Sequence, residues 1–360
     1  MIERTMNSIF KKSLHKVLFL VLTLVCVFAC KKQATQPLPP LPKDPRTYTW
    51  TIDTLKSNSG QTLMRSIWGS STKNIYTVGW DAGSLGDMFH FDGQKWKIFQ
   101  EILTPYGGPL GRPFGVHRIL GFDANNIWVV GRWSADLPEQ DSTLILHFNG
   151  QNWQSAPTVG GHPLQGIWGT SPDDIWTGGV KGALYHYDGS SWQRKQPPRS
   201  FWYNSFAGLS TNEVYALAYE YDAQGRGTRY FSMWDGTEWR ILQSFTGLPR
   251  EGAPFGDIAL FAVDGQLFSA GHGVFRKIAS GWEKLLSPAQ TVFYGMHGTA
   301  ADNLFVVGIH GRVYHYNGRD WDQLIDLAFY GLSWYDVWTD GTETFIVGTD
   351  GGVSYVAHGK

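Results

Sequence analysis

The chain repeats one pattern six times, and a seventh, incomplete copy lies at its C-terminus. Each copy contains an apolar run with Gly, a segment of the type Asp/Asn-aliphatic-aromatic, an aromatic-His-aromatic segment and finally Asp/Asn-Gly-x-x-Trp. The clearest copies open with Ser-Ile-Trp-Gly at 66–69 and Gly-Ile-Trp-Gly at 166–169. Internal repeats of 20–50 residues indicate solenoids, propellers or arrays, so this feature limits the possible folds more than any other.

A tryptophan marks the end of each full copy. These markers are Trp96, Trp153, Trp192, Trp239, Trp282 and Trp321, spaced 57, 39, 47, 43 and 39 residues apart. Each copy has four short apolar segments separated by Gly, Asp and Asn, which is typical of strands joined by tight hairpins. Four strands per copy, repeated radially, predict an all-β fold, a β-propeller of four-stranded blades. A β-helix has shorter repeats, and the 3.6-residue period of a helical solenoid is absent.

The last copy predicts the number of blades and how the ring closes. Residues 337–338, 344–348 and 353–356 supply three strands, but the strand with the marker Trp is missing. A strand of that type stands at residues 47–53, with Trp50 as its marker. Because unpaired sheet edges promote aggregation, we expect this N-terminal strand to complete the last blade. Residues 47–360 should therefore form a seven-bladed β-propeller.

Residues 1–29 have the features of a lipoprotein signal peptide. Basic residues precede an apolar run at 17–29 that is short for a membrane span. The run ends in Val27-Phe28-Ala29-Cys30, which resembles a bacterial lipobox, although Phe28 is unusual there. Cys30 would then carry lipid (palmitate), and the Pro-rich residues 30–46 would form an extended tether. An ordinary secretory signal or an anchor helix is the alternative. We expect a location in the bacterial cell envelope, at the outer membrane.

Composition narrows the classes of partner. Cys26 and Cys30 are the only cysteines, so cleavage after residue 29 would leave no thiol for disulfides or Cys-ligated metals. The remaining chain would hold 26 basic and 30 acidic residues, a net charge near −4. A nucleic-acid partner calls for a basic face, and none is indicated. No cofactor and no metal site is predicted.

The repeat resembles that of a broad group of bacterial repeat propellers. The resemblance rests on the Ile-Trp-Gly opening at 167–169, on Asp174-Ile175-Trp176 and on Asp188-Gly-Ser-Ser-Trp192. Such chains are distantly similar to sialidase-type, kelch-type and photosystem-assembly-factor propellers, and many are lipoproteins. The Asp-box of sialidases, Ser-x-Asp-x-Gly-x-x-Trp, is not matched, because Asp and Gly are adjacent here. The resemblance therefore implies the blade and leaves the activity open, since propellers host many functions.

Two repeated residue types allow both a structural and a functional interpretation. His90, His147, His186 and His315 each stand six residues before a marker Trp. Copies on different blades lie too far apart to converge on one metal ion, so we expect them to form hydrogen bonds within or between blades. We likewise expect the marker tryptophans to pack between blades rather than to stack on sugars.

The segments that precede the first strands are rich in aromatic residues. First strands line the channel of a propeller, so these segments should converge at one mouth of it. Long insertions at 104–117, 132–142, 219–228 and 244–257 belong to loops on the same face, where function usually resides. We expect an exposed aromatic face there that binds a ligand. Its candidate residues are Phe114, Trp202, Tyr203, Phe255, Phe293, Tyr294, Phe329 and Tyr330.

The favoured hypothesis is a non-catalytic lipoprotein that binds a protein or a glycan at this face. The alternative is a glycoside hydrolase or lyase that uses carboxylates at the channel mouth. Such an enzyme needs two carboxylates a few ångströms apart, and no sequence spacing pairs the candidates. A purely structural envelope protein is the third possibility. The candidate carboxylates are Glu139, Asp141, Glu220, Asp222, Glu251 and Asp257.

Overall fold

A computed structural model describes residues 43–57, 60–80, 86–98, 114–133, 142–156, 160–249, 252–329 and 331–360. Lys43–Lys360 form one compact unit. The predicted signal peptide (1–29), Cys30 and the tether up to residue 42 lie outside the described residues. In the described part of the chain, no helix is both long enough and apolar enough to cross a membrane.

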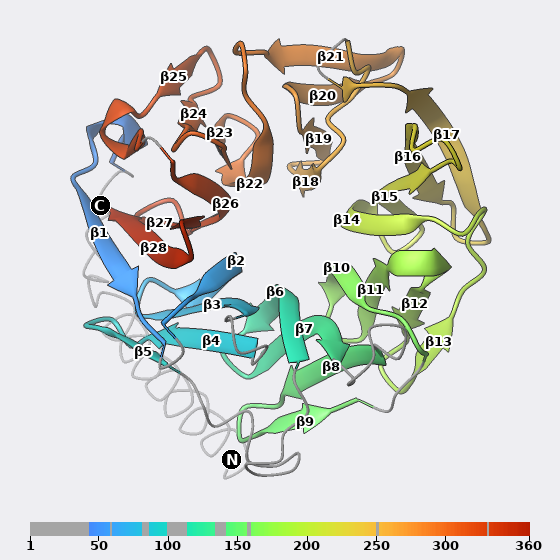
Figure 1. Cartoon of the computed structure of the whole chain (residues 1–360), viewed down its shortest axis with the longest axis horizontal. Coiled ribbons are helices and arrows are strands. Elements are labelled where there is room, and N and C mark those ends of the chain that lie inside the picture. Colours follow the sequence, from blue (N-terminus) through green and yellow to red (C-terminus); the bar gives the residue numbers. More distant parts are fainter. Residues whose placement is uncertain are drawn as a thin grey trace, which may run out of the picture. The chain divides into compact units, whose positions relative to one another are not determined.

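Seven antiparallel sheets of four strands each stand around a common centre (Figure 1). In each of these blades the first strand lies nearest the centre and the fourth lies at the periphery. Blade one comprises β2 (Leu63–Ser71), β3 (Asn74–Trp80), β4 (Gly86–Phe91) and β5 (Trp96–Ile98), and blade two comprises β6 (Phe114–Asp123), β7 (Asn126–Trp133), β8 (Ser142–Phe148) and β9 (Trp153–Ser155). Blade three comprises β10 (Leu164–Ser171), β11 (Asp174–Gly179), β12 (Leu184–Tyr187) and β13 (Trp192–Arg194). Blade four comprises β14 (Trp202–Ser210), β15 (Glu213–Tyr221), β16 (Gly227–Trp234) and β17 (Trp239–Thr246). Blade five comprises β18 (Ala259–Val263), β19 (Gln266–Ala270), β20 (Val274–Ile278) and β21 (Gly281–Leu286). Blade six comprises β22 (Phe293–Ala300), β23 (Asn303–Gly308), β24 (Val313–Tyr316) and β25 (Trp321–Gln323). Blade seven comprises β26 (Ser333–Thr339), β27 (Thr344–Asp350), β28 (Val353–Gly359) and β1 (Trp50–Leu55).

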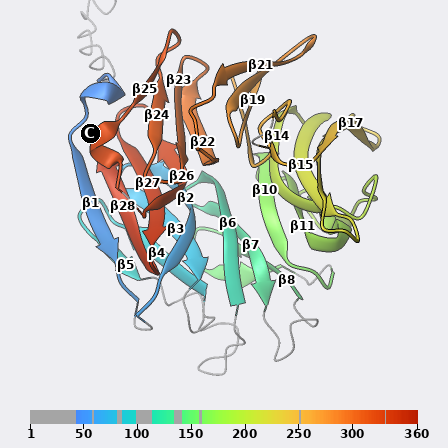
Figure 2. The same cartoon turned by 45° about the horizontal axis from the view of Figure 1, so that its top comes forward.

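The N-terminal strand completes the seventh blade, as the sequence predicts. β1 pairs antiparallel with β28, with Trp50 opposite Gly359 and Leu55 opposite Ser354. Thr49 and Lys360 extend the pairing, because each backbone N–H donates to the other's carbonyl, at 3.0 and 3.2 Å. Figure 2 shows β1 running along β28. The prediction of a seven-bladed β-propeller closed by its N-terminal strand is confirmed.

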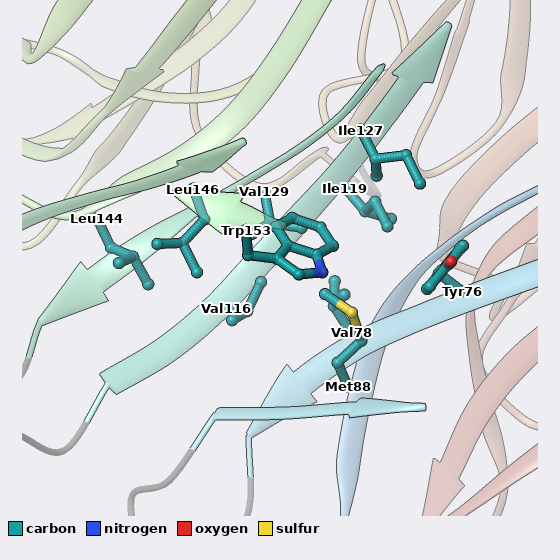
Figure 3. Close-up of a cluster of buried hydrophobic side chains, with 10 residues drawn as sticks. All are labelled: Tyr76, Val78, Met88, Val116, Ile119, Ile127, Val129, Leu144, Leu146 and Trp153. Carbon is teal, nitrogen blue, oxygen red and sulfur yellow. The ribbon is translucent and has the colours of Figure 1, made fainter. Parts of the chain in front are cut away.

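The hydrophobic core lies between neighbouring blades. In one cluster Val78 and Met88 of blade one pack against Val116, Val129 and Trp153 of blade two (Figure 3). Since sheet residues alternate between two faces, each blade gives one apolar face to each neighbour. The marker tryptophans pack in these layers, as predicted; Trp153, Trp192 and Trp239 are buried and the others are half-buried. Replacing a fully buried Trp by Ala costs about 3–5 kcal/mol.

The Asp/Asn-Gly turns form through the side chain of their first residue. In blade three the Asp188 carboxylate accepts the N–H groups of Ser190 and Ser191, at 3.0 and 2.8 Å. Gly189, between Asp188 and Ser190, has φ +87°, a conformation that costs glycine little. The chain therefore reverses just before Trp192 and aims its ring at blade two.

Each repeated histidine contacts an aromatic ring of the neighbouring strand, stacked for His90, His147 and His186 and tilted for His315. Trp128 and His147 are opposite each other in the ladder, with ring centroids 3.9 Å apart. The Nε2 atoms of His90, His186 and His315 also bond to Asn74, Asp174 and Asn303, at 2.7, 2.6 and 2.8 Å. These bonds stay within one blade, as predicted. The corresponding nitrogen of His147 is buried and has no partner among the described residues.

The blade topology separates two faces. On one face lie the turns between first and second strands and the Asp/Asn-Gly turns; we call it the turn face. First strands begin on the opposite face, which we call the mouth face. The described N-terminal segment joins the propeller at the turn face, where Arg46 pairs with Asp320 at 2.6 Å and Lys43 contacts the Lys360 carbonyl at 3.1 Å.

Candidate functional site at the channel mouth

The first strands of six blades share an irregularity close to their start. One residue in each is skipped by the pairing with the second strand, for example Arg65 between Met64 and Ser66. A bulge of this kind re-aims the side chain of the extra residue and is frequent beside functional sites. All six skipped residues are half-buried, and we call them the mouth ring. They are Arg65, His117, Gln165, Asn204, Tyr294 and Tyr335.

Members of the mouth ring make contacts from one blade to the next. Tyr294 stacks on Tyr335 with centroids 5.1 Å apart, and the Arg65 guanidinium lies 3.7 Å from the centre of the Tyr335 ring. His117 Nδ1 bonds to the Leu164 carbonyl at 2.7 Å. The Asn204 amide donates to two carbonyls of blade five, at 3.4 Å each. The ring thus combines aromatic, amide, imidazole and guanidinium groups on a rigid frame.

Below the mouth ring the channel contains a cavity of about 300 Å³. It is lined by all seven first strands through polar and apolar groups in similar measure, and its charged lining residues are Arg118 and Asp336. Ligand sites in proteins typically combine apolar lining with a few polar groups that fix orientation.

Asp336 joins blade seven to blade one. One carboxylate oxygen accepts the Ser66 hydroxyl at 2.8 Å and the Ile67 N–H at 3.1 Å, and the other accepts the Val337 N–H at 3.0 Å. Burial raises the pKa of Asp336, whereas nearby Arg118 and these hydrogen bonds act in the opposite direction. The carboxylate is therefore engaged on both oxygens by the propeller itself.

Positive charge gathers where blades one and two meet at the mouth. The Arg118 guanidinium donates to the carbonyls of Arg65 and His117, at 3.3 and 3.2 Å. Burial lowers the pKa of His117 to about 4, and Arg132, Arg118 and Arg65 add to the decrease. The imidazole is thus neutral at pH 7. Among the described residues, neither Arg65 nor Arg118 forms an ion pair within 4 Å.

The structure corrects part of the predicted aromatic face. Tyr203, Phe255 and Phe293 are each 0% exposed, so the expectation that they form an exposed surface is wrong. Tyr203 precedes the bulge of its strand and points into the core beside Phe206 and Trp239. Burial also raises the pKa of its hydroxyl. These rings stabilise blade contacts.

Other predicted residues do reach the surface. Trp202 is 39% and Phe329 43% exposed, and Tyr294 is half-buried in the mouth ring. The side chain of Phe114 and the whole of Tyr330 lie outside the described residues. Sequence reasoning missed Arg65, His117, Gln165, Asn204 and Tyr335. No shared motif distinguishes them, since a small residue follows Arg65, Gln165 and Asn204 but Arg118 follows His117 and Asp336 follows Tyr335.

The described candidate carboxylates all lie beside arginine. Glu220 approaches Arg199 at 3.2 Å, Asp222 pairs with Arg226 at 2.7 Å, and Asp257 approaches Arg229 at 3.5 Å. Glu139, Asp141 and Glu251 lie outside the described residues. Within the described part of the chain, no three His, Cys, Asp or Glu residues group as metal ligands would.

No protein-family model and no curated protein matches this sequence. Solved structures do match its fold. A structure of YCF48 bound to a D1 peptide is 17% identical, with a TM-score of 0.57 over 88% of this chain and 98% of that one. An inactive virginiamycin B lyase from Staphylococcus aureus with quinupristin is 10% identical, with a TM-score of 0.60 over 86% and 99%. The likeness is one of fold. The extracellular domain of BT4673 from B. thetaiotaomicron, 11% identical at a TM-score of 0.59, shares it over 85% of this chain and 40% of that one.

Proposed function

We propose that this protein is a lipid-anchored envelope protein that binds a macromolecular partner, a protein or a glycan, at its mouth face. The observation that carries the proposal is the mouth ring, in which six blades each place a half-buried polar or aromatic residue at a bulge beside the cavity. We favour a protein partner. In a propeller of similar fold, YCF48, a D1 peptide is bound, which makes a peptide ligand a reasonable expectation here.

The attachment point of the N-terminal segment supports this arrangement. Lys43 and Arg46 are held at the turn face, by Lys360 and Asp320. If Cys30 carries lipid, the tether joins the propeller at the turn face, opposite the mouth face. The proposed binding site would then be accessible to a partner in the aqueous phase.

The glycan and enzyme alternatives receive less support. Aromatic stacking on sugars needs free ring faces, whereas Tyr335 is contacted by both Arg65 and Tyr294. A glycosidase needs two carboxylates on either side of the scissile bond, whereas the described candidates are each held beside an arginine.

Site-specific photocrosslinking tests the proposal. A benzophenone amino acid placed at Gln165 samples the mouth face, and one placed at Gln94, in an exposed turn, samples the turn face. We expect discrete protein adducts in intact cells from position 165 and none of the same mass from position 94. A second mouth-face probe replaces Trp202. Identical adducts from positions 165 and 94, or no adduct from either mouth-face position, would contradict binding at the mouth face.

A further inference from the structure

The mouth of the channel carries two positive charges on neighbouring strands. Arg65 and Arg118 belong to neighbouring first strands, and the Arg118 guanidinium donates to the backbone carbonyl of Arg65. Neither has an ion-pair partner in the described part of the chain. Arg65 Nε is buried and lacks a hydrogen-bond partner there. Arg46 Nε and several Trp Nε1 atoms share this state in the described part of the chain, so the two charges, and not this donor, distinguish the site.

The nearest acid does not neutralise the pair. Asp336 lies close enough to Arg118 to affect its pKa, yet both of its oxygens are bonded to Ser66, Ile67 and Val337. Arg65, Arg118 and Asp336 together therefore carry one excess positive charge, since His117 is neutral at pH 7. Charge excess in a partly desolvated site attracts an anion more strongly than it would in water.

The surrounding groups pre-organise Arg65. Its guanidinium carbon lies 3.7 and 5.2 Å from the ring centroids of Tyr335 and Trp80. Cation–π contacts of this kind restrain the guanidinium, and its Nη groups remain as donors for a carboxylate. Below it, the 300 Å³ cavity with Arg118 in its wall has room for one side chain.

We propose that Arg65 and Arg118 bind a carboxylate of the protein partner, from an Asp or Glu side chain that enters the channel mouth. A singly charged, planar carboxylate suits the single excess charge, whereas a doubly charged phosphate would be repelled by Asp336. A uronic acid is less suitable because its sugar ring would need aromatic faces that Arg65 and Tyr294 already use. This inference rests on the proposed function and specifies the chemistry of its ligand.

Binding of short capped peptides to the full-length, detergent-solubilised protein tests the inference. The probe is a fluorescein-labelled ten-residue peptide of alternating Glu and Gly, followed by fluorescence anisotropy. We expect it to bind at least tenfold more tightly than the Gln-Gly peptide, and more weakly as salt increases. Arg65→Gln and Arg118→Gln should each weaken it at least tenfold. Arg240→Gln on β17, which removes an equal charge far from the channel, should not.

Several results would overturn the inference. These are equal binding of the Glu and Gln peptides, unchanged binding by both channel variants, or a preference for a phosphoserine peptide or an oligogalacturonate. If Arg118→Gln unfolds the protein, Arg65→Gln and the charge-preserving Arg118→Lys decide. Crosslinks from position 165 that persist unchanged in Arg65→Gln would refute the carboxylate while leaving the proposed function standing. The absence of crosslinks from position 165 in the otherwise wild-type protein would refute both the carboxylate ligand and the proposed function.

Discussion

The Ser66 hydroxyl donates a 2.8 Å hydrogen bond to the Asp336 carboxylate, across 270 residues of sequence. This bond joins the first strand of blade one to the first strand of blade seven, next to the point where the ring closes. A propeller holds its blades mainly by apolar packing, so a buried polar link at this place also fixes how the two strands are positioned relative to each other. The same carboxylate forms part of the cavity wall.

Replacing Asp336 by Ala should destabilise the protein. The change leaves the Ser66 hydroxyl and the Ile67 N–H without their acceptor, and each buried unsatisfied donor costs about 1–3 kcal/mol. We expect the free energy of unfolding in urea to fall by about 2–4 kcal/mol. Asp53→Ala, on the exposed side of β1, is the control and should change it by no more than about 0.5 kcal/mol. Equal effects of the two substitutions would contradict the structural link.

Removing the closing strand should disrupt the whole ring. Deletion of residues 31–54 takes away nearly all of β1 and exposes the edge of β28, together with apolar surface at blade seven. We expect a fall in Tm of more than about 5 °C, because the loss exceeds several kcal/mol. Deletion of residues 31–42 stops before the compact unit begins and should leave Tm unchanged. Closely similar melting curves of the two truncated proteins would argue against closure by β1.

The repeat allowed the fold to be predicted, because each copy encodes its strands, its turn and its marker Trp locally. Blade number and closure followed from counting these units. The site was predicted less well. Mouth and face were inferred from topology, and Tyr294 was among the predicted residues. Tyr203 was predicted in place of its neighbour Asn204, however, and Phe293, predicted beside Tyr294, is buried. A one-residue shift in a strand exchanges its two faces, and the bulges that cause it leave no obvious mark in the sequence.

Acid should destabilise the protein through its buried histidines. Burial lowers the pKa of His297 and of His315 to about 4, as it does for His117, whereas an unfolded chain has His pKa values near 6.5. Between these values the unfolded chain binds more protons, so stability is complete above pH 6.5 and is lost as the pH falls toward 4. Urea unfolding at several pH values from 7.5 to 4.5 measures how steeply the free energy of unfolding falls with pH, which is the slope in question. His297→Gln should make it shallower, and an unchanged slope would exclude this histidine as a source.

Cys30→Ser should release the protein from the membrane. A serine cannot accept the thioether-linked lipid of a bacterial lipoprotein, and no described segment could hold a membrane as a helix. Metabolic labelling with an alkyne fatty acid should disappear, and the protein should move from the pelleted membranes to the soluble fraction. Cys26→Ser, within the predicted signal peptide, is the matched control and should keep its label. A Cys30→Ser protein that still resists alkaline extraction would show that another segment provides the anchor.

Neighbouring residues at the mouth should differ sharply in their effect on stability. Trp202 is 39% exposed and Tyr203 is 0% exposed, because successive side chains of β14 point to opposite sides of the strand. Trp202→Ala should therefore change the free energy of unfolding by less than about 1 kcal/mol, while Tyr203→Ala should cost about 3–5 kcal/mol as a buried ring is lost. Only Trp202→Ala can report on ligand binding without a folding defect, so weaker partner crosslinking in that variant would place the indole in the contact surface. A large loss of stability in Trp202→Ala would instead assign this residue to the core, together with Tyr203.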